Sequence, residues 1–387
     1  MSRQSVAADT VILLSHGFQA EYEAGIANGL ARNGLNVVLV GSDSTLYERL
    51  DPSIRALNLR GCHDPQRSRF QKVWNLVRYF FSYQYLLLTT PHAAVHLIGQ
   101  FTTNRPLLFL AEMLVTRVVA RRVWLTVHNV MPHEKHTRFN HAVHRCLYAL
   151  PHELVVHTER TRQRLAELFA LDGKRVRVLE HGIARFPDFD AVARDRIRAR
   201  LGLGPTDRLL LFFGNLGLYK GPDLLIEAFG RLPAEAGWHL HIAGRCRHAD
   251  LRRQMDELIA GCPHSPRIHW EEGYVADDEV PAFFFAADAL ALPYRHIDQS
   301  GVLFMAMATG LPVIASDVGS FREYVAAHAG AIVPPEDVTA LASAIEQFVP
   351  LDESERRLLA ERARRFDWAL TARSLCRAYH PTNPEEA

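Results

Sequence analysis

One lysine in the second half of the chain stands in a loop whose residue types suit a phosphate group. The segment GNLGLYKGPD, residues 214–223, carries Gly214, Asn215 and Lys220 ahead of an expected helix over 224–232. Backbone amides, a helix N-terminus and an ammonium group together can hold a diphosphate. The chain has only four lysines against forty arginines, which singles Lys220 out. The GxxxxGK[ST] spacing is absent, so the loop is not a Walker A motif.

Two further loops of the same half carry groups that attract anions. Gly244 and Arg245 follow an expected strand, and Ser300 and Gly301 stand at the N-cap of an expected helix over 302–309. Taken alone, the Ser300 turn favours an ordinary capped helix. Three such loops in one half predict a bound nucleotide diphosphate. The expected binding residues of this half are Gly214, Asn215, Arg245, Tyr274, Tyr294, Gln299, Ser300 and Gly301.

In the first half the polar residues that follow expected strands are mostly histidines. His16 and Gly17 come after the first strand, and His128 and Asn129 open the loop HNVMPHE after another. A histidine in such a place can hydrogen-bond a sugar or a phosphate, or can cap loop backbone, and both interpretations stay open. GxGxxG is absent, so a dinucleotide site of the usual kind is not supported. A metal site is the weaker interpretation of His133, His136, His141 and His144, because no HExxH-type pattern is present.

The elements that must position these residues alternate along the chain. Short apolar runs, typical of strands, are separated by helical patterns in both halves, which predicts two doubly wound α/β domains with parallel sheets. We expect an N-terminal domain over 1–185 and a C-terminal domain over 186–360. Residues 361–387 should form a helix that crosses back. Ligands of open parallel sheets bind beyond the carboxyl ends of the strands, so a cleft between the domains is the expected site.

Composition excludes several classes of protein. The chain has 387 residues, of which 48% are hydrophobic and 22% charged, as in an ordinary globular protein. No apolar stretch is long enough for a bilayer-crossing helix, and no signal peptide is recognised at the N-terminus. The five cysteines form no CxxC pattern, so no disulfide framework or zinc site is indicated. A cytoplasmic location is the expectation.

Charge is unevenly distributed although the formal net charge is only +1. Residues 55–145 hold thirteen basic residues and three acidic ones. Such an asymmetry suggests an anionic partner or a solvated basic face. Within it, the segment 69–81 reads as a basic amphipathic helix with aromatic residues on one face. Two interpretations stay open for this helix: packing against the first sheet, and contact with an anionic membrane surface, peripheral to the inner membrane. Nucleic acid is not expected as a partner, because no recognisable motif accompanies the charge.

The chain resembles a GT-B fold glycosyltransferase of the group 1, family 4 type. The resemblance rests above all on residues 300–319, SGVLFMAMATGLPVIASDVG, and is supported by segments 178–182, 214–221 and 330–335. The segment 126–134, TVHNVMPHE, is similar to a subset acting in bacterial exopolysaccharide pathways. The resemblance implies that the second domain binds a nucleotide-sugar and that the first binds the acceptor.

The family pattern also assigns roles and shows departures. It implies that Lys220 and His128 are catalytic, and it adds His16, Gly17 and Asn129 to the binding set. The Glu-x7-Glu pair of the family falls on Ile297 and Met305, and Asn215 or Gly217 replaces its usual arginine. We expect Arg245 to supply the missing charge.

The expected activity is metal-independent transfer of a hexosyl group from a nucleotide-sugar donor to a glycan or lipid-linked acceptor, without a cofactor. The setting would be bacterial polysaccharide or glycolipid synthesis. Alternatives are a GT-B nucleotide-sugar epimerase and a non-catalytic sugar-nucleotide-binding module.

Overall fold

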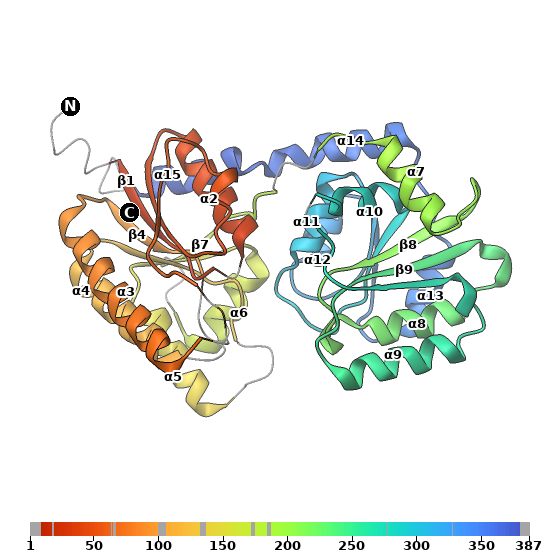
Figure 1. The fold of residues 1–387 in the computed structure, drawn as a ribbon, viewed down its shortest axis with the longest axis horizontal. Helices are drawn as coiled ribbons and strands as arrows, with labels where there is room; N and C mark the ends of the chain where they lie inside the picture. Colours follow the sequence, from red (N-terminus) through yellow and green to blue (C-terminus); the bar gives the residue numbers. More distant parts are fainter. Residues whose placement is uncertain are drawn as a thin grey trace. The chain divides into compact units, whose positions relative to one another are not determined.

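The structure is a computed structural model of the chain, and it consists of two compact units. Residues 1–184 and 366–387 form unit 1, and residues 185–365 form unit 2. The structure describes residues 9–379 except 18, 63, 65–66, 100–105, 132–136, 172–174, 184–186, 277 and 327. Each unit is an α/β domain built on a parallel sheet (Figure 1).

The sheet of unit 1 has seven strands among the described residues, in the order β3-β2-β1-β4-β5-β6-β7. All of its strand pairs are parallel. The chain moves outwards from β1 to β3 and then returns to the other side of β1, so its switch point lies between β1 and β4. The strands are β1 (Thr10–Leu14), β2 (Asn36–Gly41), β3 (Arg55–Asn58), β4 (Ala94–Leu97), β5 (Val123–Thr126), β6 (Glu153–Val156) and β7 (Val176–Val178).

Helices cover both faces of this sheet, which explains why its central strands are apolar on both sides. One face packs on α2 (Ala20–Arg32) and on α15 (Trp368–Tyr379). The other face packs on α3 (Arg69–Thr89), α4 (Pro106–Val119), α5 (Arg138–Ala149) and α6 (Glu159–Phe169). The C-terminal helix is anchored by Trp368, whose indole lies so close to Gly25 and Gly182 that a Cβ at either position would overlap it.

The sheet of unit 2 repeats the scheme with six strands among the described residues. Their order is β10-β9-β8-β11-β12-β13, and all pairs are parallel. The switch point therefore lies between β8 and β11. The strands are β8 (Arg208–Phe213), β9 (Trp238–Gly244), β10 (Ile268–Glu272), β11 (Ala289–Leu292), β12 (Val313–Ser316) and β13 (Gly330–Val333).

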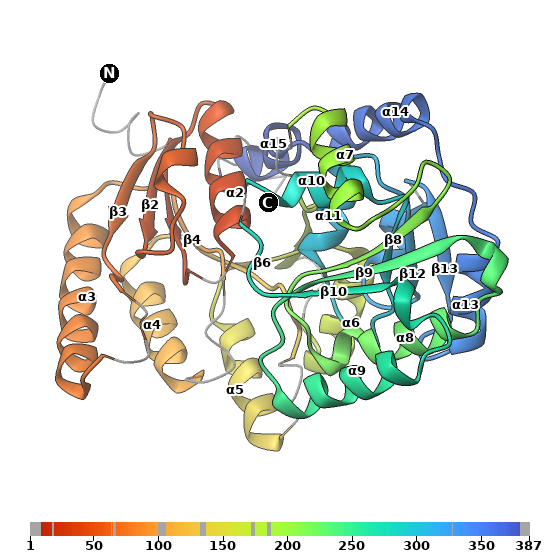
Figure 2. The same cartoon turned by 45° about the vertical axis from the view of Figure 1, so that its right-hand side comes forward.

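Two layers of helices enclose this second sheet, as Figure 2 shows. One layer holds α8 (Pro222–Gly230), α9 (Ala249–Gly261) and α13 (Val338–Glu346). The other holds α7 (Ala191–Arg200), α10 (Val280–Ala286), α11 (Gly301–Ala308) and α14 (Glu353–Ala363). The short helix α12 (Phe321–Ala326) follows β12.

The predicted fold class is confirmed: two parallel-sheet α/β domains are present. Two strands that the sequence did not predict, β3 and β13, lie at sheet edges, where they are only partly buried. β3 carries no purely apolar run, and β13 is apolar but only four residues long. The single helix expected over 361–387 is not observed: residues 361–363 end α14, Arg364–Phe366 form a 3-10 turn, and α15 begins at Trp368. Among the described residues no helix is both long enough and apolar enough to cross a membrane.

Candidate functional site

The loops that leave β8 and β11 carry the charged part of the candidate site in unit 2. The loop after β8 contains a 3-10 turn, Leu218–Lys220, and ends at Gly221 before α8 begins. Gly221 has a φ of +67°, and a Cβ there would lie 2.2 Å from the carbonyl oxygen of Pro293. Only glycine fits this close approach without strain, so the path of the backbone next to Lys220 is fixed.

Lys220 is a buried cation at the switch point. Its side chain is only 7% exposed, and its Nζ lies 5.6 Å from the centre of the Tyr294 ring. Within the part of the chain that the structure describes, Nζ has no hydrogen bond and no ion pair. Burial lowers the pKa of the ammonium group, because water no longer solvates the charge. A buried, unpaired ammonium is unfavourable unless a ligand supplies the counter-charge.

An ion pair holds the two switch-point loops together. The Arg295 guanidinium donates to both carboxylate oxygens of Asp223, at 2.8 and 2.6 Å, and to the carbonyl oxygen of Leu218 at 2.6 Å. The backbone N–H of Arg295 also donates to the carbonyl oxygen of Tyr219. These bonds fix the turn that carries Lys220, and they neutralise Asp223. The sequence did not reveal this role of Arg295, because its partners lie far away along the chain.

The N-terminus of α11 faces the same region. A Cβ on Gly214 would lie 3.3 Å from Lys220 Nζ and 3.4 Å from Val302 Cγ2, which places β8, the lysine and the first turn of α11 together. The side chain of Ser300, the N-cap residue, makes no capping hydrogen bond, so the first amides of α11 keep their capacity for an acceptor.

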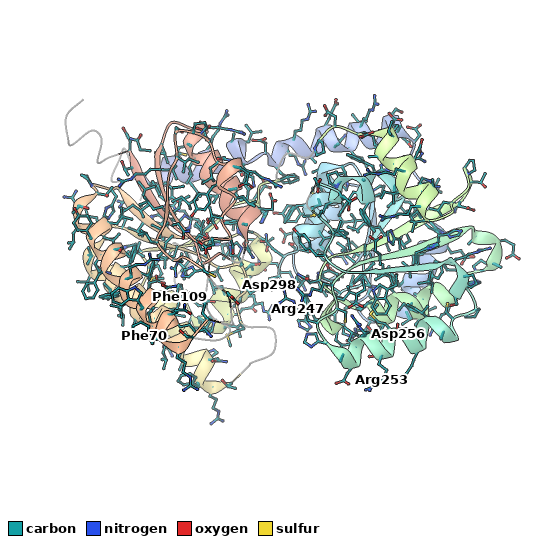
Figure 3. All side chains as sticks on the ribbon, viewed as in Figure 1. Phe70, Phe109, Arg247, Arg253, Asp256 and Asp298 are labelled. Atoms are coloured by element: carbon teal, nitrogen blue, oxygen red, sulfur yellow. The ribbon has the colours of Figure 1, made fainter. Side chains whose placement is uncertain are left out.

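Two uncharged side chains complete this loop. Gln299 Nε2 is buried and has no hydrogen-bond partner among the described residues. Burial raises the pKa of the Tyr294 hydroxyl, an effect that neighbouring Ser300 opposes. Figure 3 labels Asp298 in the same loop; its carbonyl oxygen accepts a hydrogen bond from the N–H of Ser320.

Arg245 and Gly214 are also neighbours at the strand ends. A Cβ on Gly244 would lie 1.9 Å from the carbonyl oxygen of Gly214, and Arg245 follows directly. The Arg245 side chain is exposed, and it forms no hydrogen bond or ion pair with any described residue. Asn215 is exposed in the same loop. Tyr274 is 77% exposed after the edge strand β10.

In unit 1 the corresponding switch point gathers His16 and His128 around the end of β4. A Cβ on Gly99 would lie 3.7 Å from His16 Nδ1, and His128 Nε2 donates to the carbonyl oxygen of Ile98 at 3.0 Å. Gly17 has a φ of +74°, and its N–H donates to Ser15 Oγ at 3.0 Å. The backbone of Asn129 accepts a hydrogen bond from the Tyr148 hydroxyl. These four predicted residues therefore lie at the carboxyl ends of β1 and β5.

A buried carboxylate, missed by the sequence analysis, orients His16. Glu112 in α4 accepts hydrogen bonds from His16 Nε2 at 3.1 Å, from Arg60 at 2.8 Å and from the Tyr79 hydroxyl. Burial alone would raise the pKa of Glu112, but Arg60 and then His16 outweigh burial and lower the pKa to about 2. The ionised carboxylate can only accept, so His16 Nε2 carries a hydrogen in this pair.

His128 belongs to a row of buried histidines at the ends of β5, β6 and β7. Its ring centre lies 4.5 Å from that of Tyr22 and 5.2 Å from that of His157, which in turn lies 5.2 Å from His181. Burial lowers the pKa of His128 to about 4 and that of His181 to about 3. His128 is thus neutral at pH 7, and because Nε2 is a donor, Nδ1 can accept.

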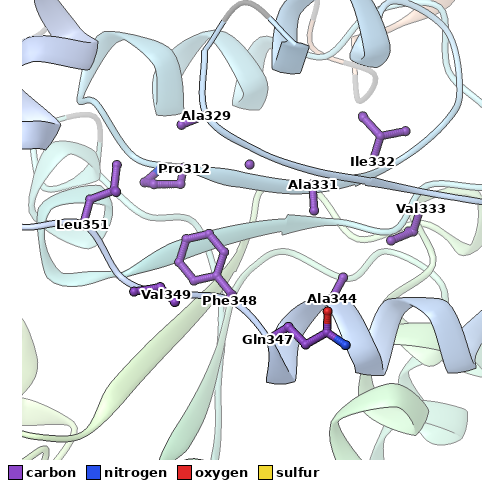
Figure 4. Close-up of a pocket in the computed structure, with 11 residues that line it drawn as sticks. Pro312, Ala329, Ala331, Ile332, Val333, Ala344, Gln347, Phe348, Val349 and Leu351 are labelled. Carbon is purple, nitrogen blue, oxygen red and sulfur yellow. The ribbon is translucent and has the colours of Figure 1, made fainter.

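Two other kinds of site were considered among the described residues: a metal centre and an apolar recess in unit 2. The described residues contain no group of three metal-ligating side chains; His133 and His136 lie outside them, and His141 and His144 bond to backbone carbonyl oxygens. A recess of about 430 Å³ lies at the edge strand β13 (Figure 4). Its lining includes Ile332 and Phe348 and none of the predicted site residues.

Part of the chain matches a known protein family, and its fold is similar to solved structures. Residues 193–366 match the family "Glycosyl transferases group 1". This match covers most of unit 2 and less than half of the chain. Two α/β units, each built on a parallel sheet, are the elements of the GT-B fold. A solved structure from Anabaena, Alr3699/HepE in complex with UDP and glucose, has a TM-score of 0.70 at 15% identity and covers 96% of this chain and 98% of its own.

Two curated relatives are each 30% identical to the chain over the aligned residues. One is a D-inositol 3-phosphate glycosyltransferase of Xylanimonas cellulosilytica, aligned over 58% of this chain and 56% of its own length. The other is the lipopolysaccharide core biosynthesis mannosyltransferase LpsB of Rhizobium meliloti, aligned over 44% and 50%. The chain thus spans about half the length of these relatives.

Lowering the pH should destabilise unit 1 at pH values where the buried histidines of the folded unit are still neutral. His96, His128, His157 and His181 are all buried, and burial lowers each pKa, whereas the unfolded chain titrates near 6.5. The contribution of these histidines to the free energy of unfolding is complete above pH 6.5. It falls as the pH drops towards 4, by about 1.4 kcal/mol per histidine per pH unit. Urea unfolding at pH 7.5 and pH 5 measures this loss.

A matched pair of variants tests the assignment. His181→Phe removes one of the buried titrating groups, so it should reduce the pH dependence of the unfolding free energy by the contribution of one proton. His248→Gln, at an exposed position of unit 2, should leave that pH dependence unchanged. Equal unfolding free energies at the two pH values in the wild-type chain would contradict the prediction.

Glu112→Gln should destabilise unit 1 by about 3 kcal/mol, because it leaves the buried Arg60 guanidinium without its counter-charge. The double variant Arg60→Met/Glu112→Met removes both charges and should recover part of that loss. Equilibrium unfolding in urea compares the three chains. A single variant as stable as wild type would show that the ion pair contributes nothing.

Proposed function

We propose that the chain transfers a sugar from a nucleotide-sugar donor, and that unit 2 binds the diphosphate of this donor. The observation that carries the proposal is Lys220, a buried ammonium without a counter-charge among the described residues, set beside the N-terminus of α11. A diphosphate would supply that charge. The glycosyltransferase family match of residues 193–366 supports the proposal, as does the UDP-bound Anabaena structure.

The same groups can assist departure of the nucleoside diphosphate. Negative charge develops on the leaving phosphate as the glycosidic bond breaks, and fixed positive groups stabilise it most in a site with little water. Lys220, Arg245 and the first amides of α11 supply this charge, so the proposed reaction needs no metal ion. Gln299 Nε2 is a further donor for a donor-sugar or nucleotide oxygen.

We assign acceptor binding to unit 1. Neutral His128 offers Nδ1 as a hydrogen-bond acceptor for a sugar or acceptor hydroxyl, and its ring is held by Ile98 and Tyr22. The acceptor class that we propose is a glycan or a lipid-linked glycan of bacterial polysaccharide or glycolipid synthesis. The name of the Rhizobium relative, a lipopolysaccharide core mannosyltransferase, supports this class and a hexosyl donor.

A non-catalytic sugar-nucleotide-binding module is the second candidate. It is favoured by one observation: Ile297 and Met305 occupy the positions of the acidic pair found in the resembling family. Such a module would bind nucleotide-sugars without releasing the nucleoside diphosphate. Thermal shift with UDP-, GDP- and ADP-sugars, followed by assay of nucleoside diphosphate release, separates the two functions.

Lys220→Ala should lower the rate of sugar transfer at least about a hundredfold, because it removes a fixed charge from the leaving group. Stability should be equal or higher, since a buried ammonium no longer has to be desolvated. Arg231→Ala, which breaks an exposed ion pair in α8, is the control. The diphosphate assignment is wrong if Lys220→Ala transfers and hydrolyses donor at wild-type rates.

Gly301→Ala separates a ligand site from an ordinary helix start. A Cβ there meets no atom within 4 Å, so alanine should stabilise the chain by up to about 1 kcal/mol. If a phosphate lies against this turn, the same methyl group should weaken nucleotide-sugar binding about tenfold. Gly261→Ala in α9 is a matched control with equally open space. Unchanged donor affinity in Gly301→Ala, measured by calorimetry, would remove α11 from the site.

A further inference from the structure

Helix α3 is apolar on the side that faces away from its sheet. Its buried residues are Tyr79, Tyr83, Leu86 and Leu87. The opposite side carries a stripe of exposed aromatic and aliphatic side chains at helical spacing: Phe70 (78% exposed), Trp74 (59%), Val77 (41%), Phe81 (67%), Tyr85 (70%) and Leu88 (74%). The aromatic face predicted over 69–81 is therefore not packed against the first sheet.

The neighbouring helix α4 extends this apolar area. The two helices are joined through the Tyr83 hydroxyl and Thr116 Oγ1, 2.9 Å apart, and through Tyr79 and Glu112. On its outward side α4 exposes Leu107, Leu114 and Val118, the last of these 85% exposed. Figure 3 labels Phe70 in α3 and Phe109 in α4, and the 1% exposure of Phe109 shows that α4 also has a buried side. We call the exposed residues of both helices the α3–α4 surface.

Charge on this surface is positive. Helix α3 exposes Arg69 and Arg78 and contains no acidic residue, and Arg117 is exposed in α4. The single acidic residue of α4, Glu112, has a side chain that is only 12% exposed and is paired with Arg60. The wider segment 55–145 holds the thirteen basic and three acidic residues noted above. A second copy of the chain would bring two positive surfaces together, whereas an anionic surface would be attracted.

We propose that the α3–α4 surface docks on an anionic membrane. Trp, Tyr and Phe side chains with flanking arginines are suited to the boundary between lipid headgroups and acyl chains. Helix α3 has 21 residues and would lie about 30 Å along the membrane plane. A capping box, in which Ser68 Oγ accepts from Gln71 N–H and Gln71 caps in return, fixes the start of the helix, so the surface is ordered before it meets lipid.

The docking proposal is argued from the α3–α4 surface and does not depend on the proposed transfer reaction. Docking would nevertheless bring the chain to a lipid-linked acceptor. Because the two proposals rest on different units, their tests can fail separately. Donor affinity in solution reports unit 2, and vesicle binding reports the α3–α4 surface.

Sedimentation of the full chain with vesicles tests the proposal. Vesicles of equal parts phosphatidylcholine and phosphatidylglycerol should bind the wild-type chain, vesicles of phosphatidylcholine alone should not, and added salt should weaken binding. Trp74→Ser/Phe81→Ser and, separately, Arg69→Gln/Arg78→Gln should each weaken binding at least tenfold. Val192→Ser/Val349→Ser removes two exposed apolar side chains from unit 2 and should bind as wild type.

Three results would overturn it. These are no binding to anionic vesicles, equal binding to neutral ones, and self-association of the wild-type chain that Trp74→Ser/Phe81→Ser abolishes without any vesicle binding; the last would identify a second copy as the occupant. Circular dichroism and donor affinity, unchanged in each variant, establish that a loss of vesicle binding is not a loss of the fold.

Discussion

Parallel pairing of the strands is the constraint on which the rest of the molecule depends. A parallel sheet brings all strand carboxyl ends to one edge, and the order of strands leaves a switch point where neighbouring loops diverge. In unit 2 the loops from β8 and β11 diverge, and Lys220 and the start of α11 occupy the space between them. In unit 1 the loops from β1 and β4 diverge, and His16, with His128 from β5 beside it, lies there. Residues far apart in the sequence meet because of topology alone.

The two switch points differ in their electrostatics. Unit 2 neutralises the acid nearest its lysine, Asp223, with Arg295 and leaves the ammonium of Lys220 uncompensated. Unit 1 pairs Glu112 with Arg60 and His16, and burial keeps His128 and His181 uncharged at pH 7. An uncompensated cation suits an anionic ligand, whereas neutral imidazoles suit hydroxyl groups. This electrostatic difference supports the proposal of a charged donor in unit 2 and a ligand rich in hydroxyl groups in unit 1.

The sequence predicted what depends on local pattern. Buried strands are short apolar runs, so all central strands and the loops after them were found, and a rare lysine among glycines marked the loop after β8. Residues defined by distant partners were missed: Arg295 acts through Asp223, and Glu112 through Arg60 and His16. His157 stands directly after β6, His128 and His181 follow β5 and β7 within three residues, and that position was a usable signal. The exposure of the apolar side of α3 could not be deduced from the sequence, because the same apolar residues would equally suit a buried core.

The replaced acidic pair changes how the donor could be held. Ile297 and Met305 are half-buried, so neither position offers a carboxylate to a ribose hydroxyl. Their replacement also removes negative charge from the loop that faces Lys220, which favours affinity for a diphosphate over recognition of the ribose. Gln299, whose Nε2 is a buried donor without a partner among the described residues, lies between these two positions in the sequence. An amide donor can bind a hydroxyl or a phosphate oxygen without adding charge. The proposed donor site thus combines charged groups for the phosphates with neutral groups for the rest of the donor.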